Sequence, residues 1–153
     1  MHPSDRPTEE DGLVRVWLDV ANVMGARPDG WWRDRAGAAS RLLAAVAACP
    51  ADTATWAAAL GASTPPDGGP SDPLEILAVL EGAACAASDP ADHTAGGIPM
   101  RVVRATGSAD DAIAAECAAG DVVVTADRGL RARVHDRGAA TVGPTAVYGL
   151  LDR

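Results

Sequence analysis

Carboxylates stand at three points of this sequence where an apolar strand ends or a helix begins. Asp19 closes the run LVRVWLDV, Asp110 and Asp111 open a helical segment, and Asp127 follows the run VVVT. In a parallel α/β sheet such positions gather at one edge, in the crevice outside the carboxyl ends of the strands. Carboxylates that meet there repel one another unless a cation or protons separate them. The four acids therefore predict a divalent metal site that acts on phosphate esters.

Alternating strands and helices must position these acids. Apolar runs and turn residues predict strands at 13–20, 74–80, 99–107 and 120–127, with a short last strand and a turn or helix within 139–151. Helices are expected at 33–49, 51–62, 108–119 and 128–136. Segments 21–34, 63–73 and 87–97 are expected to be loops, because glycine and proline punctuate them. The alternation predicts an α/β fold with a mostly parallel sheet of about five strands.

The bulk properties are those of one soluble domain. The chain has 153 residues, and no apolar run is long enough to span a bilayer. We expect residues 1–12 to be a disordered tail without a signal peptide, and residues 13–153 to form a single domain. The three cysteines have no metal-ligand spacing, and we interpret them as small core residues in a reducing cytoplasm. The three histidines are scattered and do not suggest a metal site.

The formal net charge of −8 argues against a simple electrostatic nucleic-acid binder. It does not exclude a nuclease, because a bound metal reverses the local sign of the charge. Any basic surface must be local. One cluster of arginines lies within residues 33–41, and a second, which begins with Arg128, follows Asp127 directly.

Each acid also has a purely structural interpretation. Asp19 could be a turn or cap residue held by backbone N–H groups. The segment SADD resembles a capping box, with Ser108 as the N-cap, which explains Asp111 better than Asp110. We therefore favour Asp110 as the site residue and Asp111 as its support. Asp127 could be the N-cap of the following helix.

Polar and aromatic residues beside the acids are candidates for substrate binding. Asn22 lies three residues after Asp19 and can hold its loop or contact a phosphate. Thr125 could hydrogen-bond a site carboxylate or a phosphate, and Arg128 lies next to Asp127. The segment Trp31, Trp32 and Arg33 could stack on bases and contact phosphates. Alternatively, the two tryptophans cover the first helix and anchor the loop.

Three segments resemble the NYN branch of the PIN-like nuclease superfamily: LDVANV (18–23), GSADDAI (107–113) and VVVTADRGL (122–130). The resemblance implies a Rossmann-like three-layer α/β/α domain, bound Mg²⁺ or Mn²⁺, and hydrolysis of phosphodiesters, usually in RNA. It implies that Asp19, Asp110 and Asp127 are the catalytic metal ligands, with Asn22 as the polar residue of the first motif. The chain departs from many relatives at Val20, where they carry glycine.

Three functions follow as hypotheses. The first is a cytoplasmic, metal-dependent ribonuclease in which Asp19, Asp110 and Asp127 hold the ions and Asp111 joins through water. The second is a non-catalytic module of the same fold that binds RNA or a protein partner. The third is a small-molecule phosphohydrolase or nucleotide binder in a related α/β fold, and the absence of a GxxxxGK[ST] loop and of a DxD motif argues against it. RNA against DNA and the formation of homo-oligomers remain open.

Overall fold

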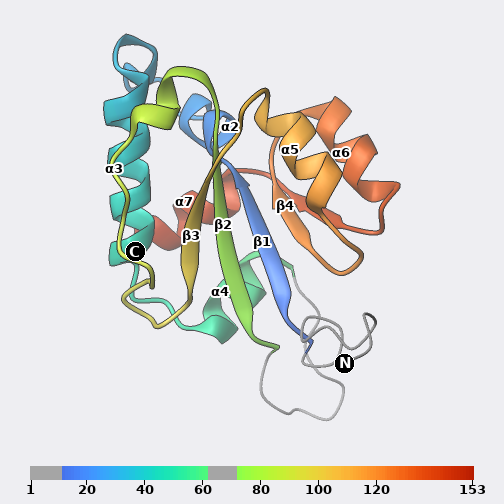
Figure 1. Cartoon of the computed structure of the whole chain (residues 1–153). Helices are drawn as coiled ribbons and strands as arrows, with labels where there is room; N and C mark the ends of the chain where they lie inside the picture. The colour runs from blue at the N-terminus through green and yellow to red at the C-terminus, as the bar shows by residue number, and fades with distance from the viewer. Residues whose placement is uncertain (1–11, 62–71) are drawn as a thin grey trace, which may run out of the picture.

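A computed structural model describes residues 12–61 and 72–153 and contains a five-stranded, all-parallel sheet (Figure 1). The strand order is β3-β2-β1-β4-β5. The strands are β1 (Val14–Asp19), β2 (Leu74–Leu80), β3 (Met100–Arg104), β4 (Val122–Val124) and β5 (Ala140–Val142). The expected α/β class and parallel sheet of five strands are confirmed.

Helices cover both faces of the sheet and complete a three-layer α/β/α arrangement (Figure 1). One face carries α2 (Val20–Gly25), α3 (Arg35–Ala48), α4 (Thr53–Ala59) and α7 (Thr145–Leu151). The other face carries α5 (Ala109–Glu116) and α6 (Arg128–His135). Two short 3-10 helices, η1 (Trp31–Arg33) and η2 (Gly82–Ala86), lie in the connections.

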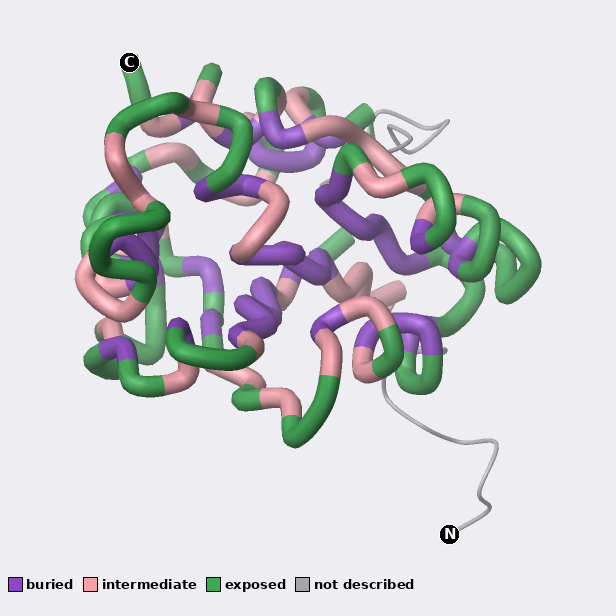
Figure 2. The backbone as a smooth tube through the Cα atoms, turned by 90° about the horizontal axis from the view of Figure 1, so that it is seen from above, coloured by how far each residue is buried: buried purple, intermediate pink, exposed green. Residues whose placement is uncertain are grey.

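The central strands are buried on both faces, which explains their continuous apolar sequences. Val16 and Leu18 of β1 face the core under α3, whereas Trp17 faces the core under α5 and α6. Seen from above, the buried segments occupy the middle of the molecule and the exposed ones its periphery (Figure 2). None of the helices in the described ranges has the length and apolar character needed to cross a membrane.

The expectation that residues 21–34 form a loop is wrong in part, because α2 and η1 lie within them. Asp19 caps α2 by accepting from the backbone N–H of Asn22, and Val20, Val23 and Met24 are buried along one side of the helix. The 3.6-residue spacing of these apolar side chains outweighs the signal of Gly25 and the later turn residues. The predicted tail 1–12 and loop 63–73 lie almost entirely outside the described residues.

Candidate active site at the carboxyl edge of the sheet

The strand order reverses at β1, whose neighbours β2 and β4 lead the chain away in opposite directions. Such a switch point opens a crevice at the carboxyl ends of the two strands where the order turns, here β1 and β4. Asp19 is the last residue of β1, and Thr125 directly follows β4. Asp19 and Thr125, which are far apart in the sequence, therefore lie side by side at this edge of the sheet.

Asp19 is almost fully buried, with 1% of the residue exposed, and its carboxylate accepts three hydrogen bonds. Its Oδ2 accepts from the Thr125 hydroxyl at 2.9 Å and from Asn22 Nδ2 at 3.1 Å. Its Oδ1 accepts from the Asn22 backbone N–H at 3.4 Å. These contacts fix the direction of the carboxylate, and no cation among the described residues neutralises it.

Asn22 and Thr125 join α2, which follows β1 directly, to the segment that follows β4. Asn22 Oδ1 accepts from the Ala126 backbone N–H at 3.0 Å, and Thr125 Oγ1 accepts from the Asp127 N–H at 3.1 Å. The Arg131 guanidinium donates two hydrogen bonds, of 3.1 and 3.0 Å, to the Thr125 carbonyl. The two predicted polar residues thus position the acids, and Thr125 is itself fully buried.

Burial raises the pKa of Asp19 from 3.8 to about 6, against the lowering effect of the hydrogen bonds from Thr125 and Asn22. The negative charges of Asp110 and Glu81 raise it further. Carboxylates from separate elements therefore repel one another at this edge. Their negative charge would stabilise a cation bound there.

Asp110 lies in the first turn of α5 and is half-buried. Its pKa is raised by burial first and then by the charges of Asp127 and Glu81, while Arg133 lowers it. Within the described ranges, no side chain forms an ion pair with Asp110. The pKa of Asp110 is therefore raised, as is that of Asp19.

Glu81 is a further member of this acidic edge. It directly follows β2, and its Oε1 accepts from the Ala109 backbone N–H at 3.2 Å, at the start of α5. Glu81 follows a buried apolar strand just as Asp19 ends one, so the sequence rule that selects Asp19 applies to it as well. Its charge contributes to the raised pKa values of both Asp19 and Asp110.

Two of the predicted acids also have clear structural roles. Asp111 is exposed, and Arg133 Nη1 donates to its Oδ1 at 2.9 Å; this contact, followed by Ser108, lowers the pKa of Asp111. Ser108 accepts from the Asp111 N–H, so the predicted cap is confirmed. Asp127 caps α6 by accepting from the Leu130 N–H at 2.8 Å through Oδ1.

The described side chains at this edge have the chemistry to bind a divalent metal but are not arranged as a preformed set of ligands. Within the described ranges, no group of three or more acids, histidines or cysteines is arranged as a set of metal ligands. The donor chemistry fits Mg²⁺ or Mn²⁺, because the edge offers carboxylate oxygens with raised pKa values and no histidine or thiol. Asp19, Asp110 and Asp127 are the residues that would hold such an ion, whereas Asp111 pairs with Arg133.

The predicted aromatic segment lies at the N-terminal end of α3. Trp31 is half-buried against the core under α3, and Trp32 is 51% exposed. Their rings meet edge to face with centroids 5.9 Å apart, and the Arg33 guanidinium lies 5.9 Å from the centroid of Trp32. Arg128 is exposed at the start of α6, beside Asp127.

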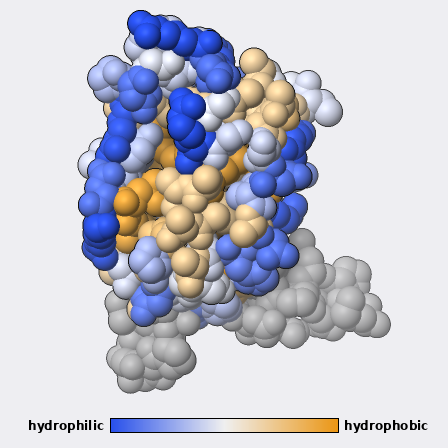
Figure 3. Space-filling view, turned by 90° about the vertical axis from the view of Figure 1, so that its left-hand side faces the viewer, coloured by the Kyte–Doolittle hydropathy of each residue, from blue (hydrophilic) through white to orange (hydrophobic). Residues whose placement is uncertain are grey.

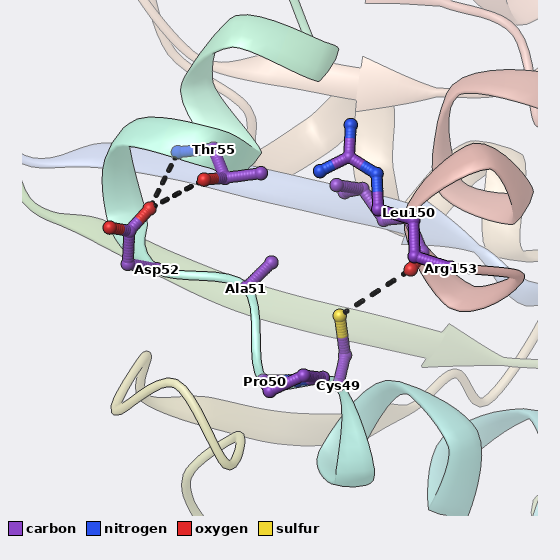
Figure 4. Close-up of a pocket in the computed structure, with 7 residues that line it drawn as sticks. All are labelled: Cys49, Pro50, Ala51, Asp52, Thr55, Leu150 and Arg153. Carbon is purple, nitrogen blue, oxygen red and sulfur yellow. Dashed lines mark hydrogen bonds between the residues drawn. The ribbon is translucent and has the colours of Figure 1, made fainter.

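A cavity of about 320 Å³ lies at the opposite end of α3 and takes no part in this site (Figure 4). Asp52 in its wall caps α4 by accepting from the N–H and the hydroxyl of Thr55. Cys49 is buried and directs its thiol to the Leu150 carbonyl at 3.9 Å. None of the predicted site residues lines this cavity.

Comparison with known proteins gives a partial family match. The model of the uncharacterised YaiI/YqxD family (DUF188) matches residues 87–147, which is less than half of the chain but includes Asp110, Thr125 and Asp127. No curated protein matches the chain. Among solved structures, Rae1 (YacP) from Bacillus subtilis, crystallised as a point mutant, is similar with a TM-score of 0.49 and 13% identity. The similarity covers 91% of this chain and 75% of that one.

Proposed function

We propose that this protein is a nuclease that hydrolyses phosphodiester bonds, with RNA as its substrate. Mg²⁺ or Mn²⁺ would be bound at the carboxyl edge of the sheet. The observation that carries the proposal is Asp19, a buried carboxylate at the switch point with a raised pKa and acidic neighbours. The sequence resemblance to the NYN branch of PIN-like nucleases supports it.

The residues at this edge would have different roles in the reaction. Asp19, Asp110 and Asp127 would hold the ion, which when bound supplies a water of lowered pKa and offsets charge on the leaving oxygen. Asn22 and Thr125 fix the direction of Asp19 through their hydrogen bonds. Arg128, exposed beside the edge, is placed to contact a phosphate of the substrate.

The test is cleavage of a labelled single-stranded RNA with Mg²⁺, with Mn²⁺ and with EDTA. We expect cleavage by the wild-type protein with either metal, and none by Asp19→Asn. Asp136→Asn is the matched control, since it removes the same charge from the exposed C-terminal end of α6. Full activity of the Asp19→Asn protein would refute the assignment.

A second function, a non-catalytic RNA-binding or protein-binding module of the same fold, is favoured by one observation. Asp127 and Asp111 are occupied as a cap and an ion-pair partner, and the described residues hold no preformed set of metal ligands. A module of this kind would show no thermal shift with Mn²⁺, and its binding would weaken on Trp32→Ala.

A further inference from the structure

A second cavity, of about 210 Å³, opens between α2, η1, α3 and α7 and combines aromatic rings with arginines. Its wall includes Trp31, Tyr148, Arg27 and Arg41, with Met24 and Leu42 as its apolar floor. Figure 3 faces the α3 side of the molecule and shows apolar side chains gathered there within a hydrophilic border. The cavity is smaller than sites for drug-sized ligands and suits one flat ring system.

Two guanidinium groups already lie against the aromatic rings of this cavity. The Arg27 guanidinium lies 3.7 Å from the ring centroid of Tyr148 and is held by Asp152. The Arg35 guanidinium lies 5.3 Å from the centroid of Trp31. Guanidinium planes and indole rings are the groups on which proteins stack unpaired bases. The exposed Arg41 at the rim adds a charge for a phosphate.

The helix α2 connects this cavity to the acidic edge. Asp19 caps its first turn, whereas Met24, in its last turn, lines the cavity. The Tyr148 hydroxyl donates to the Val23 carbonyl at 2.7 Å and so ties the cavity wall to α2. Six helical residues span about 9 Å. Even at the spacing of about 3.4 Å found along one strand of a stacked duplex, that length holds no more than about three nucleotides.

We propose that this cavity holds one nucleobase of a single-stranded nucleic acid whose backbone follows α2 to the acidic edge, an inference that rests on the proposed function. The base lies within about three nucleotides of the phosphate at Asp19. Stacking does not depend on the identity of the base, so the subsite selects unpaired strands rather than a sequence. A duplex cannot use it, because its bases are already paired and stacked.

The test measures binding of a short, fluorescein-labelled single-stranded RNA of mixed sequence by fluorescence anisotropy, in EDTA so that no cleavage occurs. We expect Trp31→Leu to raise the Kd at least about fivefold, since loss of one stacked base costs about 1–3 kcal/mol. Arg41→Ala removes a phosphate contact and should also raise the Kd, by more than the control variant does. The matched control is Arg153→Ala, which removes the same charge beside the other cavity and leaves the Kd within about twofold.

Unchanged binding by Trp31→Leu and Arg41→Ala would overturn the proposal, as would an equal loss on Arg153→Ala. A loss confined to Trp32→Ala would place the stacked base on the exposed ring and also overturn it. If Trp31→Leu lowers the melting temperature, its loss of binding could result from unfolding. The Kd of the Arg41→Ala variant, whose changed residue is exposed, then decides the test. A dimer in sedimentation that Arg41→Ala dissociates would assign the cavity to a second copy of the chain.

The same variants separate this inference from the proposed function. Binding with the expected pattern but no cleavage by the wild-type protein with metal supports the subsite and refutes hydrolysis. Cleavage without the expected pattern supports hydrolysis and refutes the subsite.

Discussion

Two buried aspartates in this fold have opposite surroundings. Asp121 accepts from Trp17 Nε1 at 3.0 Å and from the Ala118 N–H at 2.9 Å, and Arg15 lies 3.2 Å from the same oxygen. Asp19 is equally buried but has acidic neighbours and no cation. A charge that weakens the fold is typical of a site retained for function. The two residues can therefore be separated by their effect on stability.

We predict that Asp19→Asn stabilises the metal-free protein at neutral pH. The pKa of Asp19 is about 6 when folded and 3.8 in the reference state, so the folded chain binds more protons between these values and loses stability as the pH rises through them. The cost of ionisation reaches about 3 kcal/mol above pH 6. Thermal melts from acidic to neutral pH should show the variant gaining stability over the wild type as the pH rises.

The matched change Asp121→Asn should instead destabilise the protein, because it leaves Arg15 without its anionic partner. A loss of stability in both variants at neutral pH would contradict the different roles of the two acids.

Two buried tryptophans provide a second comparison. Trp17 donates its N–H to Asp121, whereas Trp56 Nε1 has no hydrogen-bond partner among the described residues. Both Trp17→Phe and Trp56→Phe create a similar cavity, so the difference between them isolates the N–H group. We predict that Trp17→Phe costs about 1–3 kcal/mol more in urea unfolding. Equal losses would show that the Trp56 N–H is satisfied in solution.

At the level of elements, the end of α3 is closed by the loop that precedes β3. The backbone N–H groups of Ala95 and Gly96 donate to the carbonyls of Ala47 and Cys49, at 2.7 and 3.2 Å. The last carbonyls of a helix need such partners. The chain packs closely here, since a Cβ on Gly96 would lie 2.0 Å from the Ala51 carbonyl oxygen.

We predict that Gly96→Ala destabilises the protein by about 1–3 kcal/mol or more, because backbone and not a flexible side chain opposes the new methyl group. The control is Gly149→Ala in α7, where no atom lies within 4 Å of the added Cβ. That change should stabilise the protein by about 0.5–1 kcal/mol. Denaturant unfolding of the two variants measures both effects, and a neutral Gly96→Ala would contradict the close approach.

At the scale of the whole molecule, charge limits how the protein can bind a polyanion. The net charge is −8, and every basic residue of the chain apart from histidine is an arginine. Most of the arginines after β4 are already occupied: Arg131 with Thr125, Arg133 with Asp111, and Arg137 with the Cys117 carbonyl. Among the described residues, few arginines therefore remain for phosphates, and these lie near α3 and at Arg128.

We predict a weak dependence of RNA binding on salt. Each phosphate contact on a single strand contributes about −0.7 to the slope of log affinity against log salt. Three or four arginines then give a slope of about −2 to −3. Anisotropy titrations in EDTA at several KCl concentrations measure it. A much steeper slope would show a basic surface that the described residues do not form.

Local patterns in the sequence were sufficient for much of the fold. The strand at 74–80 has the predicted bounds, because a continuous apolar run marks a strand buried on both faces. The Ser108 cap followed from its spacing to Asp111. The prediction failed at α2, where glycine and proline nearby concealed a short apolar spacing that becomes helical when it packs on β1 and β2.

The contacts of the site residues required the tertiary structure. Thr125 could be named as a partner for a carboxylate, but its bond to Asp19 joins residues far apart in the sequence. The hydrogen bond of Glu81 is made to the start of α5, which the sequence does not place beside it. The cavity at Trp31 is completed by Tyr148 from the last helix. A single sequence gives no direct signal for such pairings.

The hydrogen bond between Asp19 and Thr125 has a consequence for biosynthesis. During translation, β1 and β2 leave the ribosome well before β4, and a nascent chain that ends at β3 has Asp19 but neither Thr125 nor Asp127. Its acidic edge is incomplete until the last third of the domain has been made and has folded against β1. Whatever chemistry the edge performs, the chain acquires it only after β4 and the start of α6 have been made.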